Sequence, residues 1–516
     1  TAHEEMVLSA LREMKNPPYI SLSSRVLPEF REYERASTVV VNAYVGKGMS
    51  RYLGELEGPL GKGLRIMQSS GGSITARLAS EQPVRTILSG PAGGVVGAFY
   101  SAMQAGYPDI ITLDMGGTST DVSLIQNGVP NISRQTTLGY YPIKVPSVEV
   151  HSVGAGGGSI AHVPMTGALR VGPESAGAEP GPAAYGKGGR QPTVTDANMV
   201  LGRLPNSLLG GEMALDVKAS EEVVSKIAHS LGLDLYQAAA GILDIVNENM
   251  FGALRLVTVQ KGLDPRDFAL VAFGGAGPLH GNAIGILGGC FPVIIPPTPG
   301  VLSALGFLYS DVKNEFAQTF VRIINETEGS QISEILTKLG RNARIWLQEE
   351  GIPDSDQNVR SEADVRYFRQ GYEFSMEVNP NTLTNGGLES LTSRFGAAHE
   401  QLYGFKLDQP VELVNLRAVG TGEVEKIKFP KFEKGSQDPS GAVEKQHQVY
   451  FDGNFVMTNI YDRNKLTSGN RITGPAVITQ KDSTSIIHPG HVGEVDEYLN
   501  ILIYPAGDVP GDISHE

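Results

Sequence analysis

Two carboxylates and two threonines surround a pair of glycines in the segment Asp114-Met115-Gly116-Gly117-Thr118-Ser119-Thr120-Asp121. Glycine lets backbone N–H groups approach an anion, and threonine hydroxyls can donate hydrogen bonds to it. Two nearby aspartates can hold a magnesium ion, directly or through water. The pattern is typical of a phosphate clamp formed by Asp114, Gly116, Gly117, Thr118, Thr120 and Asp121. An ordinary polar hairpin is the alternative, because Gly-Gly and Asp are common in turns.

Two apolar runs must position these residues. Residues 110–113 are apolar and rich in β-branched side chains, which predicts a buried strand. Residues 122–125 form the second run, and Asn127-Gly128 after it is a strong turn pattern. We therefore expect a strand, a glycine turn and a returning strand.

A second glycine cluster follows an apolar strand expected over residues 143–150. Residues 154–158 contain four glycines, and such a run disfavours both helix and strand. A close backbone approach or an anion-binding nest would explain it, whereas a flexible linker conflicts with the apolar flanks. The candidate site residues here are His151, Gly156, Gly157, Gly158 and Ser159. A purely structural histidine is the alternative for His151.

Two further carboxylates are candidate site residues. Glu174 lies in the Gly/Pro-rich stretch 171–190, whose composition is typical of an ordered loop at a site. Asp196 follows it in the segment Thr195-Asp196-Ala197-Asn198. Asp196 can serve as a site carboxylate or, like Thr195, cap a helix that runs through Leu201.

A third glycine turn follows a fully apolar strand expected over residues 268–273. The turn contains Gly274, Gly275 and Gly277, and His280 follows in the next predicted helix. A strand, a glycine turn and a helix bring backbone close to a planar or phosphate-bearing ligand. The stretch is not the dinucleotide-binding fingerprint, because the spacing differs and no acidic residue follows at the expected distance.

Composition limits the class of protein. The chain has 516 residues, 41% of them hydrophobic and 19% charged, which predicts several folded domains. A net charge of −14 without a basic stripe argues against nucleic acid as a partner. A single cysteine, Cys290, excludes an intrachain disulfide and is compatible with the cytoplasm. No apolar run reaches membrane-spanning length, so we expect neither a membrane-spanning segment nor a membrane partner.

The expected organisation is α/β followed by a β-rich region. Helices are expected over residues 5–14, 36–53, 221–231, 235–259 and 330–350. From residue 364 onward alternating apolar positions predict antiparallel strands, and residues 433–446 are expected to form an exposed loop. We divide the chain into residues 1–20, residues 21–312 and residues 313–516, the last of which we expect to be a separate α+β domain.

As an ordered set, these motifs resemble the hydantoinase A / 5-oxoprolinase family over nearly the whole chain. The residues that carry the resemblance are 22–24, 31–38, 67–72, 89–94, 113–121, 154–161, 171–189, 195–198 and 273–280. The resemblance implies an actin/sugar-kinase/Hsp70-like ATPase fold in which ATP lies between two lobes. It also implies that residues 21–312 are the hydantoinase A-type ATPase region and that residues 1–20 are the remnant of a preceding N-terminal lobe. It also implies that ATP, with Mg²⁺, activates an amide, imide or enolate oxygen.

Two departures from the family pattern stand out. Members normally begin with another lobe that carries its own Asp-Gly-Gly-Thr clamp, whereas this sequence starts at Thr1, near the end of that lobe. We expect the lobe to come from a longer polypeptide or from a separate chain. Members usually have Cys where this chain has Ala184, so any role of that thiol is ruled out here.

The resemblance assigns residues to roles. Asp114 and Asp121 are expected to bind magnesium and, with His151 and Asp196, to be catalytic. Gly116, Gly117, Thr118, Thr120, Gly274, Gly275 and Gly277 are expected to bind the nucleotide. Gly156, Gly157, Gly158, Ser159, Glu174 and His280 are expected to face the substrate or a second metal.

Three functions remain open. The first is an ATP-dependent hydrolase subunit for a cyclic amide such as hydantoin or 5-oxoproline, working with a hydantoinase B-like partner in a hetero-oligomer. The second is the ATPase subunit of an acetone- or acetophenone-type carboxylase, which would act on a ketone. The third is an actin-like structural or regulatory subunit without turnover.

Overall fold

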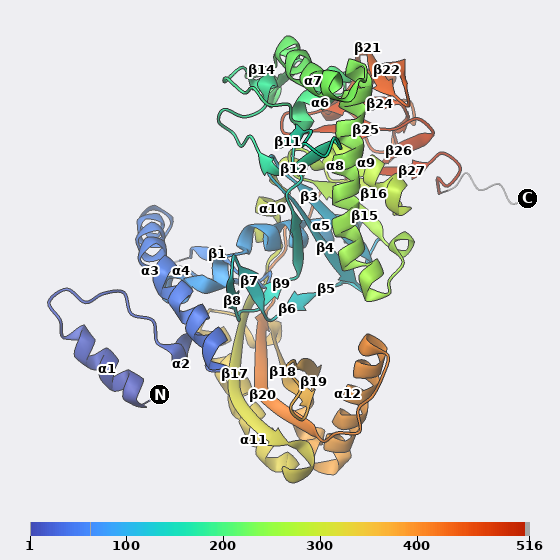
Figure 1. Ribbon diagram of the computed structural model, residues 1–516. Coiled ribbons are helices and arrows are strands. Elements are labelled where there is room, and N and C mark those ends of the chain that lie inside the picture. The colour runs from blue at the N-terminus through green and yellow to red at the C-terminus, as the bar shows by residue number, and fades with distance from the viewer. Residues whose placement is uncertain (1, 62, 511–516) are drawn as a thin grey trace, which may run out of the picture. The chain divides into compact units, whose positions relative to one another are not determined.

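The computed structural model describes residues 2–61 and 63–510 (Figure 1). The chain folds into two compact units, each assembled from three separate segments. Unit 1 consists of the described residues of Thr1–Ala92, Ile132–Ser147 and Tyr309–Lys426. Unit 2 consists of the described residues of Gly93–Asn131, Val148–Leu308 and Ile427–Glu516. The domain boundaries expected from the sequence, at 20/21 and 312/313, divide the chain into consecutive segments. These domain boundaries remain a prediction.

Unit 2 is built on a mixed sheet with the strand order β10-β4-β3-β15-β16-β27-β26-β23. Its strands are β3 (Ile110–Met115), β4 (Thr120–Gln126), β10 (Val150–Val153), β15 (Ala269–Phe273), β16 (Val293–Ile295), β23 (Arg471–Thr473), β26 (His491–Val495) and β27 (Ile501–Pro505), with β5 (Val129–Pro130) paired to β4. The pairs β3–β15 and β15–β16 are parallel, while β3–β4 is antiparallel. Every residue of β15 is buried, as expected for a parallel strand covered on both faces.

Helices cover both faces of this sheet. Figure 1 shows α8 (Leu235–Val257) and α9 (Gly277–Gly288) together beside β3, β4 and β15. A capping box between Asp234 and Gln237 starts α8, and its apolar stripe faces the core. On the other face, residues 93–104 of α5 (Ser89–Gln104) cross α10 (Leu302–Tyr309) closely. A Cβ atom on Gly97 would lie 2.5 Å from the Leu302 carbonyl oxygen, so this crossing requires glycine.

Smaller elements complete unit 2. A four-stranded sheet has the order β21-β22-β24-β25, and β11 pairs with β12. These strands are β11 (Ser159–His162), β12 (Arg170–Ser175), β21 (Val443–Phe451), β22 (Asn454–Asp462), β24 (Ala476–Thr479) and β25 (Thr484–Ile487). The helices α6 (Val194–Val200) and α7 (Val217–Leu231) pack against each other and α8.

Unit 1 is built on a sheet with the strand order β1-β2-β17-β20-β18-β19. Its strands are β1 (Arg65–Met67), β2 (Ser73–Thr75), β17 (Val312–Ile323), β18 (Gln357–Tyr367), β19 (Phe374–Glu377) and β20 (Val411–Gly422), and a separate hairpin joins β7 (Thr136–Leu138) to β8 (Tyr141–Ile143). Its helices are α1 (Ala2–Arg12), α2 (Ser23–Val26), α3 (Glu32–Leu60), α4 (Ala76–Glu81), α11 (Gly329–Glu349) and α12 (Leu388–Tyr403).

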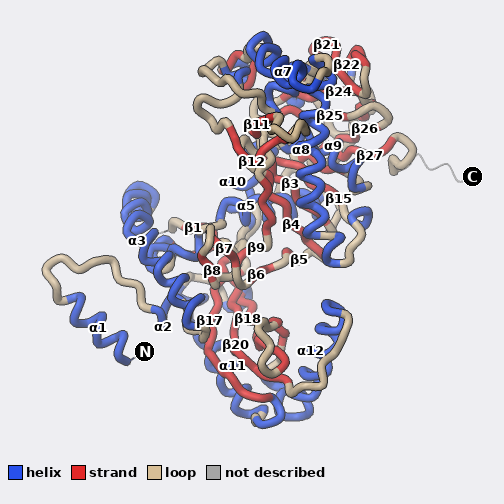
Figure 2. The backbone as a smooth tube through the Cα atoms, in the orientation of Figure 1, coloured by secondary structure: helices blue, strands red, loops and turns tan. Residues whose placement is uncertain are grey.

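One face of this sheet is apolar and the other is charged. Figure 2 shows α11 running along β17, β18 and β20, and its Leu336 and Ala343 join Leu416 and Ala418 of β20 in a buried apolar cluster. Phe316 of β17 packs against the same cluster. Residues alternate between the two faces of a strand, so the residues between these apolar positions point to the opposite face, and several of them are charged.

Two expectations about secondary structure were wrong. The strand expected over residues 143–150 is interrupted, since β8 ends at Ile143, β9 is limited to Ser147–Val148, and Pro146 between them has no N–H to donate to a ladder. The loop expected over residues 433–446 contains the start of β21, whose first strand residues are mostly exposed. No helix in the described part of the chain is long and apolar enough to cross a membrane.

Candidate nucleotide-binding site

The β3–β4 hairpin forms as expected and presents its glycines at the tip. Asp114 lies directly opposite Asp121 in the ladder, and the Gly116 N–H donates to the Ser119 carbonyl at 3.1 Å. Gly117 and Thr118 are exposed. Within the described residues, their backbone N–H groups make no hydrogen bond, so two donors are available to an anion.

The two aspartates of the hairpin are partly buried without a cation. Neither forms an ion pair with any side chain in the described part of the chain. Burial raises the pKa of Asp114 to about 6, and the negative charge of Asp121 contributes to the shift. Burial also raises the pKa of Asp121, while the hydrogen bond that the Ser152 hydroxyl donates to it acts in the opposite direction. The site therefore favours a bound cation.

This arrangement fits a magnesium ion. Magnesium is usually held by one or two carboxylates together with waters and substrate phosphates. Among the described residues no cluster of three or more His, Cys, Asp or Glu side chains could hold a metal. Asp114 and Asp121 thus match the pattern in which the nucleotide supplies the remaining ligands.

The glycine run after β10 packs on the hairpin tip. The N–H groups of Gly157 and Gly158 donate to the carbonyl oxygens of Gly116 and Gly117 at 3.0 and 2.6 Å. A Cβ atom on Gly156 would lie 2.6 Å from the Thr118 nitrogen. The close backbone approach therefore explains the run, and these two N–H groups are unavailable to an anion.

Two hydroxyls near the tip hold backbone in place. Buried Thr120 donates to the Ala155 carbonyl oxygen at 2.5 Å. Buried Ser159 accepts from the Gly156 N–H at 2.8 Å. Thr120 therefore holds the hairpin against the glycine run, and Ser159 stabilises the backbone of the run itself. Thr118 remains exposed at the tip.

The turn between β15 and α9 lies against the same hairpin. The Ala276 N–H donates to the Met115 carbonyl at 2.9 Å. Gly274 adopts φ +82°, and a Cβ atom there would lie 2.5 Å from Asp114 Oδ1. A Cβ atom on Gly277 would lie 3.2 Å from the Leu113 carbonyl oxygen. The structure thus brings Gly274, Gly275 and Gly277 together with the hairpin.

A cavity of about 200 Å³ opens beside these turns. Its lining combines residues of the hairpin, the glycine run, α6, the β15–α9 turn and the segment before β25. They include Gly116, Gly117, Gly157, Tyr185, Thr195, Asn198, Gly275, Ala276, His280, Lys481, Asp482 and Thr484. The hairpin, Gly157, the β15–α9 turn and His280 therefore meet at one place.

His280 is a neutral, buried member of the cavity wall. Its side chain is 2% exposed, and burial, with a contribution from the charge of Arg203, lowers its pKa to about 3. The ring Nδ1 lies 2.7 Å from Asn247 Oδ1, to which it donates. Nε2 is then left as an acceptor, 3.5 Å from the Asn198 amide nitrogen. His280 can therefore orient a ligand without carrying charge.

Asp196 is fully engaged in local structure. It accepts hydrogen bonds from the backbone of Ala183, Ala184 and Thr193 and from the hydroxyls of Thr193 and Ser220, at 2.7–3.3 Å. Together with Thr193 it forms the capping box of α6. This carboxylate is 0% exposed and does not line the cavity, so its geometry is that of a helix cap.

His151 and Glu174 lie away from the cavity lining. Ser152 pairs with Asp121 in the ladder, whereas His151 pairs with Val122. Because alternate residues face opposite sides of a sheet, His151 lies on the face opposite to Asp114 and Asp121. Glu174 is exposed on β12, beside Ser175, whose hydroxyl lies 3.5 Å from the Gly117 carbonyl oxygen. The structure does not bring either residue into the site.

Several cavity residues were missed by sequence reasoning. Asp482 accepts from the Gly300 N–H at 2.9 Å and lines the cavity beside Lys481. Tyr185 and Asn198 also line it. Asn198 lies in the segment 195–198, in which only Asp196 was predicted as a site residue. Nothing in the local sequence around residues 481–484 indicates a site, because only the tertiary fold brings this segment to the hairpin.

Comparison with known proteins gives a consistent family. The model of the hydantoinase/oxoprolinase family matches residues 35–338, and that of the hydantoinase/oxoprolinase C-terminal domain matches residues 323–504. The caprolactamase subunit alpha of Pseudomonas jessenii is 34% identical over 95% of this chain and 72% of its own length. The crystal structure of the ATP-dependent caprolactamase from that organism has a TM-score of 0.88, covering 98% of this chain and 75% of that chain at 33% identity.

Two more distant relatives differ in their named reactions. The 5-oxoprolinase 1 of Arabidopsis thaliana is 33% identical over 94% of this chain, which spans 40% of that protein. A nucleotide-free structure of acetone carboxylase has a TM-score of 0.76, covering 98% of this chain and 74% of that chain at 26% identity. The α/β architecture of these neighbours agrees with the actin-like ATPase fold and C-terminal domain expected from sequence.

Proposed function

Because this chain belongs to the hydantoinase/oxoprolinase family, we propose that it binds ATP in unit 2 and uses it to activate a cyclic amide for ring opening. The observation that carries the proposal is the tip of the β3–β4 hairpin. There, two free backbone donors lie next to two partly buried aspartates that have no cation among the described residues. Donors and a cation site together suit a polyphosphate.

The chemistry overcomes the poor reactivity of an amide. The amide oxygen attacks the γ-phosphorus, the bond from phosphorus to the ADP oxygen breaks, and ADP leaves. Water then adds to the activated carbon, and the ring C–N bond breaks to leave an acyl phosphate and a free amine. A second water hydrolyses the acyl phosphate to a carboxylate and phosphate. The balance is lactam, ATP and two waters giving an amino acid, ADP and phosphate. The protein contributes mainly positioning and charge neutralisation.

The chain's residues divide this work. The N–H groups of Gly117 and Thr118 donate to phosphate oxygens, and Thr118 can add its hydroxyl. Asp114 and Asp121 hold Mg²⁺, directly or through water, and the ion when bound neutralises phosphate charge. The turn at Gly274, Gly275 and Gly277 receives the nucleoside portion of ATP, while neutral His280 accepts a hydrogen bond from the ligand at its Nε2.

The complete activity is proposed to need other protein parts. The relative from Pseudomonas jessenii is named as a subunit, which supports a hydantoinase B-like partner that completes the hydrolysis. We also expect a further lobe with its own phosphate clamp, in the same polypeptide or a separate one, and an assembly that works in the cytoplasm.

A second candidate is the ATPase subunit of a ketone carboxylase. The structural likeness to acetone carboxylase favours keeping it, because it extends over 98% of this chain. In that reaction ATP would activate the enolate oxygen of a ketone rather than an amide oxygen. The phosphate site would serve both reactions equally, so the hairpin does not discriminate between them.

The test combines binding with product analysis. Isothermal titration with Mg-ATP is followed by ADP release with caprolactam, hydantoin or 5-oxoproline, with and without the partner subunit. A parallel series uses acetone or acetophenone with bicarbonate. Lactam-dependent ADP release supports the hydrolase, and ketone- and bicarbonate-dependent release supports the carboxylase instead. ATP binding that is unaffected by Asp114→Asn, in an assembly whose activity also stays unchanged, would overturn the site and support a non-catalytic subunit.

A further inference from the structure

Unit 1 contains a layer of charged side chains buried on one face of its sheet. Arg417 of β20 lies opposite Ala317 of β17 and Glu362 of β18, and Glu315 precedes Ala317 by two residues. These positions therefore share the face that points away from α11. Arg417 is 3% exposed and forms ion pairs with Asp364 at 2.6 Å, Glu29 at 3.0 Å and Glu315 at 3.4 Å.

Side chains from other segments of unit 1 cover this layer. Lys144, after β8, is 6% exposed and pairs with Glu29 at 2.8 Å and Glu373 at 3.5 Å. Arg134, before β7, pairs with Glu315 at 2.8 Å and Glu362 at 2.5 Å. Both cations thus have two carboxylate partners each, and the layer is tightly cross-linked.

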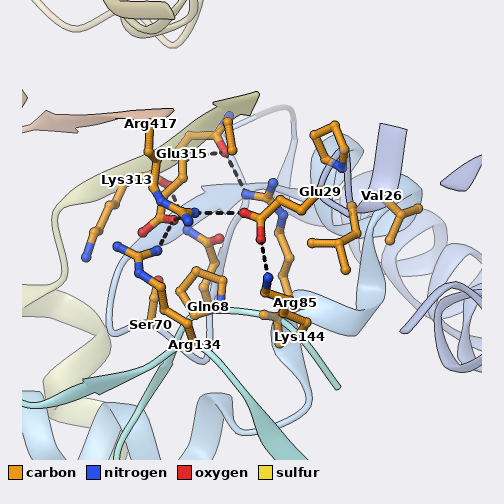
Figure 3. Close-up of a pocket in the computed structure, with 16 residues that line it drawn as sticks. Val26, Glu29, Gln68, Ser70, Arg85, Arg134, Lys144, Lys313, Glu315 and Arg417 are labelled. Carbon is orange, nitrogen blue, oxygen red and sulfur yellow. Dashed lines mark hydrogen bonds and ion pairs between the residues drawn. The ribbon is translucent and has the colours of Figure 1, made fainter. Parts of the chain in front are cut away.

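A cavity of about 70 Å³ lies within the layer (Figure 3). A water molecule needs roughly 10–15 Å³ by such a measure, so there is room for several waters or for one small ion. The charged side chains in its wall are Glu29, Arg85, Arg134, Lys144, Lys313, Glu315 and Arg417. Five of these side chains are cationic and two are anionic. The wall has an excess of cations because Glu362, Asp364 and Glu373, which form ion pairs with cations of the wall, do not line the cavity themselves.

Two of the five cations, Arg85 and Lys313, have no Asp or Glu within ion-pair distance among the described residues, unlike the other three cations of the wall. Arg85 donates from one nitrogen to Asn314 Oδ1 at 2.6 Å, and Lys313 makes no side-chain hydrogen bond within the described residues. Burial lowers the pKa of both groups, and in each case the charge of Glu315 offsets the effect only in part.

We propose that this cavity is a binding site for a small oxyanion, a carboxylate or a phosphate, held by Arg85 and Lys313. Such an anion supplies the charge that burial makes costly to leave unpaired. Arg134 and Lys144, already paired, form the rest of the cationic wall. Glu29 and Glu315 repel an anion less than free carboxylates would, because each is neutralised by two cations.

A purely structural network is the competing explanation. It accounts for Arg134, Lys144 and Arg417, each of which has close carboxylates. It does not account for a partly buried lysine and arginine that face a polar cavity without such a partner. The two explanations predict different behaviour when Arg85 or Lys313 loses its charge.

The test is calorimetric titration of the full chain in chloride buffer, without ATP, using inorganic phosphate in one arm and acetate in the other. We expect saturable binding in at least one arm, and the arm that binds identifies the oxyanion. Arg85→Gln and Lys313→Met are each expected to weaken that binding tenfold or more, since charge-assisted hydrogen bonds are lost. Arg341→Gln, at an exposed position on α11 in the same unit, is the matched control and should leave binding unchanged.

Thermal unfolding gives an independent readout. Without the anion, Arg85→Gln should be at least as stable as the parent chain, because an unpaired cation is removed. With saturating anion, only the parent and Arg341→Gln should gain stability. Absence of binding in both arms, or binding that neither Arg85→Gln nor Lys313→Met weakens, would overturn the proposal. Because no nucleotide is used and the variants lie in unit 1, this outcome is independent of ATP binding in unit 2.

Discussion

Gly274 lies so close to Asp114 that a Cβ atom at position 274 would be 2.5 Å from the carboxylate oxygen Oδ1. Gly274 also has φ +82°, a conformation that residues with side chains rarely adopt. The β15–α9 turn can therefore pack against the hairpin carboxylate only because residue 274 has no side chain.

Gly274→Ala is expected to displace Asp114 and to strain the turn. We expect a loss of about 1–3 kcal/mol in the free energy of unfolding and a fall in ATP turnover of roughly 100-fold, since small misplacements at a reacting centre are costly. Chemical denaturation and ADP release measure the two effects. Gly252→Ala, on α8 of the same unit and outside the site, is the matched control, because a Cβ atom there would have nothing within 4 Å. Equal effects of both variants would contradict the relationship.

Asp114→Asn is expected to separate stability from activity. The ionised carboxylate is partly buried beside Asp121 without a cation, so its neutral replacement should raise the free energy of unfolding at pH 7 by about 1–2 kcal/mol. ATP turnover should fall by roughly 100-fold or more, because the magnesium ion proposed to neutralise phosphate charge loses a carboxylate ligand. Thermal unfolding without magnesium tests the first effect. Asp234→Asn, which exchanges one good helix cap of α8 for another, should change neither quantity.

Asp196 is expected to behave as a structural residue. Asp196→Ala should lower the free energy of unfolding by about 3 kcal/mol, because several buried donors lose their acceptor. Turnover per folded molecule should stay within roughly threefold of the parent. Asp216→Ala, at the N-cap of α7, provides a comparison at about 1 kcal/mol. A large loss of turnover in a stably folded Asp196→Asn protein would instead assign this carboxylate a catalytic role.

The buried pair of Asp364 and Arg417 predicts acid sensitivity of unit 1. Burial by itself would raise the pKa of Asp364, but the charges of Arg417 and Arg134 and hydrogen bonds from Ser375 and Arg417 lower it to about 2. Because the pKa is depressed in the folded state, the stabilisation is complete above the unfolded pKa of about 4 and is lost as pH falls towards 2. It amounts to about 2 kcal/mol.

Equilibrium denaturation between pH 6 and pH 2 measures this contribution. The parent chain should lose stability below about pH 4, whereas Asp364→Asn should start less stable and lose less over the same range. Asp408→Asn, at an exposed loop position of unit 1, should follow the parent chain. Parallel curves for the parent and Asp364→Asn would show that the ion pair contributes nothing to acid sensitivity.

The strands and glycine turns of the candidate site were largely predictable because their pattern is local. The strand, glycine turn and returning strand occupy residues 110–126, so their register follows from adjacent sequence. The apolar strand before Gly274 was equally clear. In contrast, Asp482 reaches the cavity from a distant part of the chain, and Asp196 satisfies backbone donors that only the folded chain brings together.

Unit 1 was less predictable for a physical reason. The antiparallel strands of the C-terminal region were expected from residue 364 onward, yet β17 starts at Val312 and carries Lys313 and Glu315 on an inward face. Hydrophobic alternation identifies strands whose inward face is apolar. A strand that buries charge on one face does not give that pattern, and the partners of Glu315 lie at Arg134 and Arg417, far apart in the sequence.

The charged layer also fixes how the strands of unit 1 can align. Side chains alternate with a period of two, so a slip of β17 by one residue against β20 would turn Glu315 towards α11 and bring Phe316 among the charges. Both exchanges are unfavourable, and they would occur together. The layer therefore discriminates against misaligned pairings during folding, a task that an apolar face on both sides of the sheet would perform less well.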